Sequence, residues 1–172
     1  SIAFLKNIVN TDVFNESLTS ILSSGDNWTL YPPAGSSMMN LDRAKAAAKE
    51  YIDNIAPLLW KLSLDLHKHP EIAFEEKRSS AQITQFLEEQ GFQLERGVAG
   101  LPTAFRAIRP AKGKNKPAVS YMSEYDALPG LGHACGHNLI AMASAGAGAA
   151  LANILKPETG EVQVLGTPAE EG

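Results

Sequence analysis

Apolar residues recur at helical spacing in the stretch that follows residue 40. Their spacing is close to the 3.6-residue period of an amphipathic helix, and they are Ala44, Ala48, Tyr51, Ile52, Ile55, Leu59, Leu62 and Leu66. Asn40 or Asp42 is a suitable N-cap, and His69 is the expected last residue because it precedes Pro70. Pro57 lies inside the pattern, so we expect it to kink or divide the helix.

A second helix is predicted over residues 74–90. Ile83, Phe86 and Leu87 fall on one side of it and form its expected buried stripe. Gly91 follows at the position where glycine commonly ends a helix, because glycine adopts the left-handed backbone conformation easily.

A third helix is predicted over residues 139–155, a run that contains no charged residue. The run approaches the length of a short membrane span. Small and polar residues interrupt it at Ser144, Gly146, Gly148 and Asn153. We therefore interpret it as a closely packed helix buried inside a globular domain.

Elsewhere the apolar residues alternate with polar ones, as they do in strands. Residues 103–108 and 118–122 are separated by a turn rich in Pro, Gly and Lys, which predicts a hairpin or two neighbouring strands. Residues 161–165 predict a buried strand. This order of helices and strands predicts an α/β fold, in which ligand-binding groups lie in loops at the strand ends.

Composition and charge narrow the possible functions. A chain of 172 residues with 44% hydrophobic residues can form one globular core. With a net charge of −4, the chain has no general basic field to hold a nucleic-acid backbone. A single cysteine excludes an internal disulfide and leaves a structural, metal-binding or nucleophilic thiol.

Residues 1–40 are interpreted as a linker or irregular arm without assigned chemistry. Two N-glycosylation motifs occur there, at Asn15-Glu16-Ser17 and Asn27-Trp28-Thr29. Glycosylation at these motifs requires a secretory compartment. No retained signal peptide is visible at the N-terminus.

Side chains able to bind metal or transfer protons gather in three segments. These segments are Glu124-Tyr125-Asp126, residues 133–137 and Glu170-Glu171. Gly136 separates Cys135 from His137, so a turn or extended backbone points both side chains to one side. A thiolate and an imidazole suit zinc or a similar transition metal. The spacing alone also fits a small buried cysteine and a hydrogen-bonded loop histidine.

Glu170 and Glu171 are adjacent carboxylates that repel each other unless a cation or solvent relieves them. In an extended segment their side chains face opposite ways, so one can bind metal while the other acts as general base toward water. Asp126 is a further carboxylate that can orient a histidine ligand. A solvated acidic turn at 170–171 and an ordinary turn at Asp126 are the alternative interpretations.

Read together, these segments resemble the M20 family of metallopeptidases and amidohydrolases. The matching segments, in order, are Leu66-His67-Lys68-His69-Pro70-Glu71, Glu75-Glu76, and residues 123–129, 132–138 and 166–172. The resemblance covers about residues 41–172. Glu124 and Asn138 resemble one branch of the family, because many other members have Asp at both positions.

The resemblance implies an α/β fold, namely the N-terminal part of an α/β/α sandwich metallohydrolase catalytic domain. Residues 41–172 would then be a partial catalytic domain, preceded by the unassigned arm at residues 1–40. The family's lid domain, which mediates dimerisation, would be absent from this chain. A homodimer is implied for the complete protein.

The resemblance also implies a site for two metal ions. The residues carried over are Cys135, His137 and Glu171 as metal ligands, Glu170 as catalytic base and Asp126 as a supporting catalytic residue. His67, His69 and His133 are interpreted as structural. Asn138 cannot supply the negative charge of an aspartate. Zinc is the expected divalent metal, and manganese or cobalt also suits these ligands.

The number of histidines limits what this chain can do alone. It has four histidines and none follows His137, whereas the resemblance implies further histidine ligands for two metal ions. We therefore expect this chain by itself to bind metal weakly and to hydrolyse little or no substrate.

The predicted function is metal-dependent hydrolysis of an amide bond in a small molecule, either a dipeptide or an N-acyl amino acid. The alternative is a truncated, non-catalytic binding or regulatory protein that retains a metal half-site. A third hypothesis makes Cys135 a nucleophile paired with His137. No nucleic-acid or membrane partner is expected. The lone cysteine favours a cytoplasmic location, and the two glycosylation motifs favour a secreted one.

Overall fold

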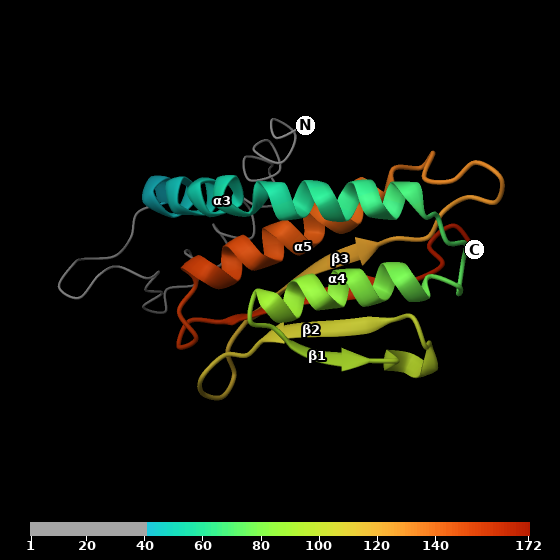
Figure 1. Ribbon diagram of the computed structural model, residues 1–172. Helices are drawn as coiled ribbons and strands as arrows, with labels where there is room; N and C mark the ends of the chain where they lie inside the picture. Colours follow the sequence, from blue (N-terminus) through green and yellow to red (C-terminus); the bar gives the residue numbers. More distant parts are fainter. Residues whose placement is uncertain (1–40) are drawn as a thin grey trace.

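Residues 41–172, which the computed structural model describes, form a four-stranded sheet and three α-helices, of which two pack directly on the sheet (Figure 1). In chain order the elements are α3 (Leu41–Lys68), α4 (Lys77–Glu89), β1 (Gln93–Arg96), the 3-10 helix η1 (Val98–Gly100), β2 (Phe105–Arg109), β3 (Ala118–Glu124), α5 (His137–Ile154) and β4 (Glu161–Thr167). The arm and the two glycosylation motifs predicted for residues 1–40 lie outside the described residues.

The sheet has the strand order β1-β2-β4-β3. β2 pairs antiparallel with β1 and with β4, whereas β3 and β4 are parallel. A parallel pair needs a crossover connection, and α5 supplies it. The carboxyl ends of β3 and β4 therefore meet, with Glu124 opposite Thr167. The loops that follow these two residues carry most of the predicted site residues to one edge of the sheet.

The predicted pairing of β2 with β3 is wrong, because β4 lies between them. β2 pairs instead with β1, a strand that the sequence pattern does not predict. The residues of β1 are mostly exposed, so they show no alternation of apolar and polar side chains. Periodicity reveals that a segment is a strand, but the choice of neighbour depends on the crossover made by α5.

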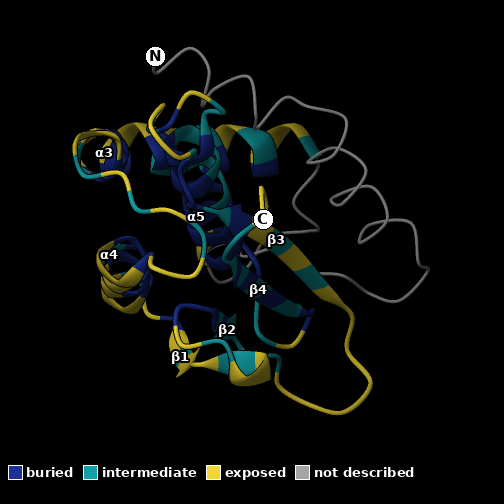
Figure 2. Ribbon diagram, turned by 90° about the vertical axis from the view of Figure 1, so that its right-hand side faces the viewer, coloured by how far each residue is buried: buried dark blue, intermediate teal, exposed yellow. Residues whose placement is uncertain are grey.

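Helices α4 and α5 cover one face of the sheet, and α3 lies over α5 as an outer layer (Figures 1 and 2). On β4 the residues Val162, Val164 and Gly166 are buried and alternate with half-buried ones. Met122 on β3 is paired with Leu165 and is 57% exposed. A mixed sheet with packed helices confirms the predicted α/β class, and the helices of the described residues cover this one face.

Helix α3 runs without interruption through Pro57. Of the two expected effects of Pro57, a kink or a division, the structure therefore excludes the division. Ile52 and Ile55 before the proline and Leu59 after it are all buried in the core. Packing of this apolar face on both sides of the proline outweighs the loss of one backbone hydrogen bond.

Helix α4 begins at Lys77 and not at Phe74, because Phe74 has a left-handed backbone with φ 65°. The side chain of Glu71 caps the start of the helix. Its Oε1 accepts a hydrogen bond from the Arg78 backbone N–H at 3.0 Å, and its Oε2 accepts one from the Ser79 N–H at 2.7 Å. The predicted buried stripe of α4 and the left-handed Gly91 after it are confirmed.

Small residues on α5 allow neighbouring elements to approach closely. A Cβ atom added at Gly146 would lie 2.9 Å from Leu59 Cδ1 on α3. One added at Gly148 would overlap Val164 Cγ2 on β4. The predicted close packing of this helix is confirmed. Among residues 41–172, no helix has the length and apolar character needed to cross a bilayer.

Replacing Gly148 with alanine is expected to destabilise the fold by about 1–2 kcal/mol. The new methyl group overlaps the stiff Val164 side chain, and this cost exceeds the gain in helix propensity. Urea unfolding measures the change. Asn153→Ala is the matched control, because Asn153 is exposed on the same helix. Equal or higher stability of the Gly148→Ala protein would contradict this prediction.

Candidate metal centre

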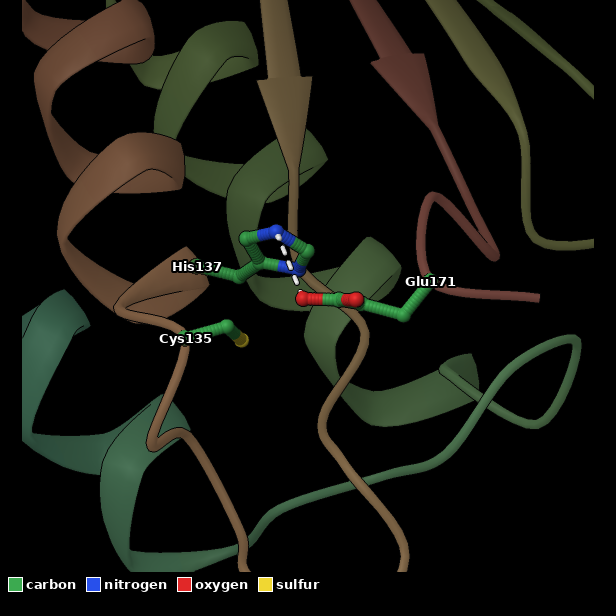
Figure 3. Close-up of side chains that lie close together, drawn as sticks. All are labelled: Cys135, His137 and Glu171. Carbon is green, nitrogen blue, oxygen red and sulfur yellow. Dashed lines mark ion pairs between the residues drawn. The ribbon is translucent and has the colours of Figure 1, made fainter.

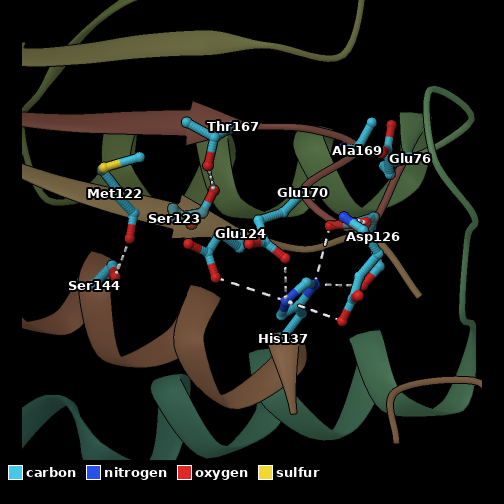
Figure 4. Close-up of polar contacts among 11 residues, drawn as sticks. Glu76, Met122, Ser123, Glu124, Asp126, His137, Ser144, Thr167, Ala169 and Glu170 are labelled. Atoms are coloured by element: carbon cyan, nitrogen blue, oxygen red, sulfur yellow. Dashed lines mark hydrogen bonds and ion pairs between the residues drawn. The ribbon is translucent and has the colours of Figure 1, made fainter. Parts of the chain in front are cut away.

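The candidate site lies where β3, β4 and α5 meet. Glu124 is the last residue of β3, and Glu170 and Glu171 follow the end of β4. His137 is the first residue of α5, which begins after Gly136 with φ 89°. This left-handed glycine turns the chain sharply between Cys135 and the helix. Segments far apart in the sequence thus bring their side chains to one point (Figure 4).

The imidazole of His137 is at the centre of this arrangement, and the residue is only 3% exposed. Its Nδ1 lies 3.0 Å from both the backbone oxygen and the Oδ1 of Asp126. A carbonyl oxygen can only accept a hydrogen bond, so Nδ1 carries a proton. Nε2 then faces Glu170 Oε2 at 3.5 Å, Glu124 Oε2 at 3.6 Å and Glu171 Oε1 at 4.0 Å.

This geometry fits a bound cation. In neutral His137 with the proton on Nδ1, the lone pair of Nε2 points toward three carboxylate groups. Lone pairs and negative charges repel each other unless a cation or a proton lies between them. An imidazole nitrogen and carboxylate oxygens are common ligands of divalent transition metals. The imidazole and carboxylate donors found here are therefore among the metal-ligand types that the sequence predicts.

The three predicted metal ligands Cys135, His137 and Glu171 lie together (Figure 3). One ligand atom from each residue is within 4.8 Å of the other two. Cys135 is half-buried and has no disulfide partner. Sulfur, nitrogen and oxygen donors from the α5 end and the β4 loop could therefore contact one ion.

Glu170 and Glu171 do not face opposite ways, as an extended segment would require. They lie in a turn that follows Ala169, whose φ is 58°. Because of this turn, both carboxylates approach the same ring of His137. The Glu170 side chain is 49% exposed, so its carboxylate also reaches solvent.

Asp126 is completely buried and joins two parts of the site. One carboxylate oxygen, Oδ1, accepts the hydrogen bond from His137 Nδ1, and the other, Oδ2, accepts one from the Glu171 backbone N–H at 3.0 Å. The residue thus holds the ring of His137 and the backbone beside Glu170 in one relative position.

Glu124 belongs to the site, although the sequence places it only in a segment of potential ligands and indicates no specific role for it. Its carboxylate forms a second group of potential ligands with His137 and Glu170, again with ligand atoms within 4.8 Å. The signal that could have identified it is its position two residues before Asp126, because alternate residues of an extended segment face the same side.

The other three histidines are not in either group of potential ligands within residues 41–172. His69 Nδ1 contacts the Asp65 carbonyl oxygen at 3.0 Å, at the end of α3. His67 is exposed. His133 is buried, and burial lowers its pKa.

Asn138 has a structural contact that a carboxylate could not make. The residue is 7% exposed, and its Nδ2 donates hydrogen bonds to the backbone oxygen and the Oγ of Ser63, at 3.3 and 3.0 Å. The asparagine therefore ties the first turn of α5 to α3. An aspartate at this position would have no proton to donate to the Ser63 carbonyl when ionised.

The Asn138→Asp substitution is expected to cost about 1–3 kcal/mol of stability near neutral pH, because it buries a carboxylate beside an unpaired carbonyl oxygen. Burial raises the folded-state pKa of such an aspartate. The folded state then binds more protons than the unfolded state, so the loss should shrink as the pH falls toward about 4.

Urea unfolding at several pH values tests this prediction. Asn115→Asp is the matched control, because Asn115 lies in an exposed turn. An Asn138→Asp protein with the stability of this control at neutral pH would contradict the assigned contact.

Comparison with known proteins finds relatives of this chain, although no protein-family model matches it. Over 150 residues the chain is 45% identical to Xaa-Arg dipeptidase of Mus musculus, which aligns 81% of this chain with 35% of that protein. It is 34% identical over 151 residues to a p-aminobenzoyl-glutamate hydrolase polypeptide of Escherichia coli (strain K12), which aligns 77% of this chain with 29% of that protein.

Among solved structures, the chain is similar to a dinuclear metal binding peptidase from the M20 family, from Bacillus subtilis. The TM-score is 0.61 at 27% identity, and the match covers 69% of this chain and 36% of that chain. The chain thus spans about a third of the length of the relatives that it matches.

Proposed function

Because this chain belongs to the M20 family, we propose that it forms part of an amide hydrolase site. The chain spans about a third of the length of its relatives. In this proposal Cys135, His137 and Glu171 hold a divalent metal ion and Glu170 is the general base. The observation that carries the proposal is the meeting of these three ligands, with ligand atoms within 4.8 Å, beside the carboxylate of Glu170.

A divalent ion at this place would polarise the scissile carbonyl group and make water more acidic. Glu170 is suited to accept the proton of the attacking water, because its carboxylate lies beside His137 and is half exposed to solvent. The same carboxyl group can then deliver the proton to the leaving amine. Water and the amide are thereby converted into a carboxylic acid and an amine.

Two other residues would orient the site. Asp126 holds the proton of His137 on Nδ1, which leaves Nε2 free to bind a cation. It also fixes the Glu171 backbone N–H. Both contacts are made by a carboxylate that is shielded from water, so the geometry is set before substrate arrives.

The names of the relatives suggest the substrate class. One is named for a dipeptide and another for p-aminobenzoyl-glutamate, and both compounds contain an amide bond next to an amino acid. We propose a dipeptide or an N-acyl amino acid as substrate. Zinc suits the mixed sulfur, nitrogen and oxygen ligands best, and cobalt is a useful spectroscopic substitute.

A titration of the 172-residue chain with Co²⁺ tests the proposal. We expect a sulfur-to-cobalt absorption band that saturates at one ion per chain, because both groups of potential ligands share His137. Cys135→Ser should abolish the band. No band, or a band that survives this substitution, would contradict the ligand set.

Isothermal titration with Zn²⁺ and an assay of dipeptide and N-acyl amino acid hydrolysis complete the test. We expect weak metal binding and little turnover by this chain alone, because three protein ligands serve only one ion. Two tight zinc sites would contradict that expectation. Metal binding without hydrolysis in every longer form of the protein would favour a non-catalytic metal-binding role.

A further inference from the structure

The side chain of Glu76 is fully buried, yet the proposed hydrolysis does not use it. Glu76 lies directly before α4. Its Oε1 accepts hydrogen bonds from the backbone N–H groups of Phe74 at 3.0 Å and Ala169 at 2.9 Å, and its Oε2 accepts one from Thr103 Oγ1 at 2.9 Å. Burial of a carboxyl group is unfavourable unless it is hydrogen-bonded, so this group has a specific structural task.

Both backbone N–H groups that bind Oε1 belong to residues in the left-handed conformation. The φ angle is 65° for Phe74 and 58° for Ala169. Residues with a Cβ atom seldom adopt such angles and keep them only where the surroundings enforce them. One oxygen of Glu76 thus holds two turns that are 93 residues and 2 residues away from it along the chain.

The turn at Ala169 decides where the two glutamates of the site lie. Ala169 comes directly before Glu170, and its N–H is bound by Glu76. Directly after Glu170, the N–H of Glu171 is bound by Asp126. Glu170 therefore lies between two backbone amides, each held by a fully buried carboxyl group (Figure 4).

Glu76 is itself anchored to the rest of the core. Thr103, which donates to Glu76, accepts a hydrogen bond on its carbonyl oxygen from the Tyr125 hydroxyl at 2.7 Å. The Tyr125 ring is buried and stacks on Phe105 with ring centroids 5.9 Å apart. Tyr125 lies between Glu124 and Asp126 in the sequence, so the network connects the loops that follow β3 and β4.

We propose that Glu76 is a positioning residue that fixes the left-handed turn at Ala169 and thereby places Glu170 and Glu171 beside His137. This inference rests on the proposed function of those two glutamates. Asp126 holds the turn from the side of His137, and Glu76 holds it from the side of α4.

Amide hydrogen exchange of the metal-free 172-residue chain tests the positioning directly. Glu76→Met keeps the size of the side chain but removes both oxygen acceptors, whereas Glu76→Gln keeps one oxygen for the two N–H groups. The matched control is Glu71→Met. The Glu71 carboxylate also accepts three hydrogen bonds, from Arg78 and Ser79 in the first turn of α4, but none from the Ala169 turn.

We expect exchange at both Ala169 and Glu171 to be at least about tenfold faster in Glu76→Met. In Glu76→Gln and Glu71→Met, exchange at these two amides should stay within about threefold of the parent chain. Faster exchange that spreads to Glu171 is the signature of a released turn, since a purely local role of Glu76 would affect only Ala169.

Co²⁺ affinity, followed by the cobalt absorption band of Cys135, is the second measurement. Loss of positioning should weaken binding by about 10–100-fold in Glu76→Met, and the other two variants should bind nearly as the parent does. A folded Glu76→Met protein with unchanged Glu171 exchange and Co²⁺ affinity would overturn the inference.

Two further outcomes are also decisive. If the parent chain binds no Co²⁺, the proposed function fails, and the exchange rates alone then decide whether Glu76 positions the turn. If Glu76→Met does not fold, Glu76→Gln takes its place, because it keeps an acceptor. Fast exchange at Ala169 in a folded Glu76→Gln protein would overturn the inference.

Discussion

The Glu170→Gln substitution is expected to lower amide hydrolysis by about 10²–10⁴-fold, in any form of the protein with measurable activity, and to leave its metal content unchanged. The amide of glutamine cannot accept a proton from water at neutral pH. Glutamine keeps the size of the glutamate side chain. In the parent protein the Glu170 carboxylate lies 3.5 Å from His137 Nε2 and is half exposed. The measurement is kcat together with metal content determined by atomic absorption.

Glu75→Gln is the control for this experiment. Glu75 is exposed and forms an ion pair with Lys77, so its substitution should change kcat little. If Glu170→Gln keeps the parent rate, Glu170 is not the general base. If the substitution removes the metal, Glu170 is a ligand and belongs to the second group with Glu124.

The Asp126→Asn substitution is expected to weaken metal binding by about 10–100-fold. The aspartate accepts hydrogen bonds on both oxygens, one from His137 Nδ1 and one from the Glu171 N–H. Asparagine has one oxygen, so its NH₂ group must face one of these two donors. Either the ring of His137 or the backbone at Glu171 then loses its fixed position.

A Co²⁺ titration measures this effect, and circular dichroism verifies that the variant is folded. Asp65→Asn is the control, because Asp65 forms an exposed ion pair with Arg78 and belongs to neither group of potential ligands. An Asp126→Asn protein that binds Co²⁺ as tightly as this control would show that Asp126 does not orient the ligands.

Much of the fold could be predicted because the relevant signals are local. The helical period of residues 44–66 and the buried stripe of α4 arise from side chains a few positions apart. The alternating burial of β4 is local as well. The strand β1 carries no such signal, since its side chains are mostly exposed. Its existence depends on pairing with β2 and not on its own sequence pattern.

Some of the candidate ligands could also be predicted, because they lie close together in the sequence. The positions of Cys135 and His137 on either side of a glycine suggested a shared site, and the structure brings their donor atoms together with Glu171. The expected opposite orientation of Glu170 and Glu171 is wrong, because it assumed an extended backbone. The left-handed conformation of Ala169 is enforced by Glu76, 93 residues earlier in the chain.

The sequence by itself determined the periods of the helices and strands, the α/β class, and the residue types available for metal binding, because these depend on neighbours along the chain. The tertiary structure alone decided that β4 lies between β2 and β3, that three carboxylates face His137 Nε2, and that Glu76 and Asp126 hold the turn around Glu170. Each of these features joins groups that are distant in sequence, and only packing of the whole core brings such groups within hydrogen-bonding distance.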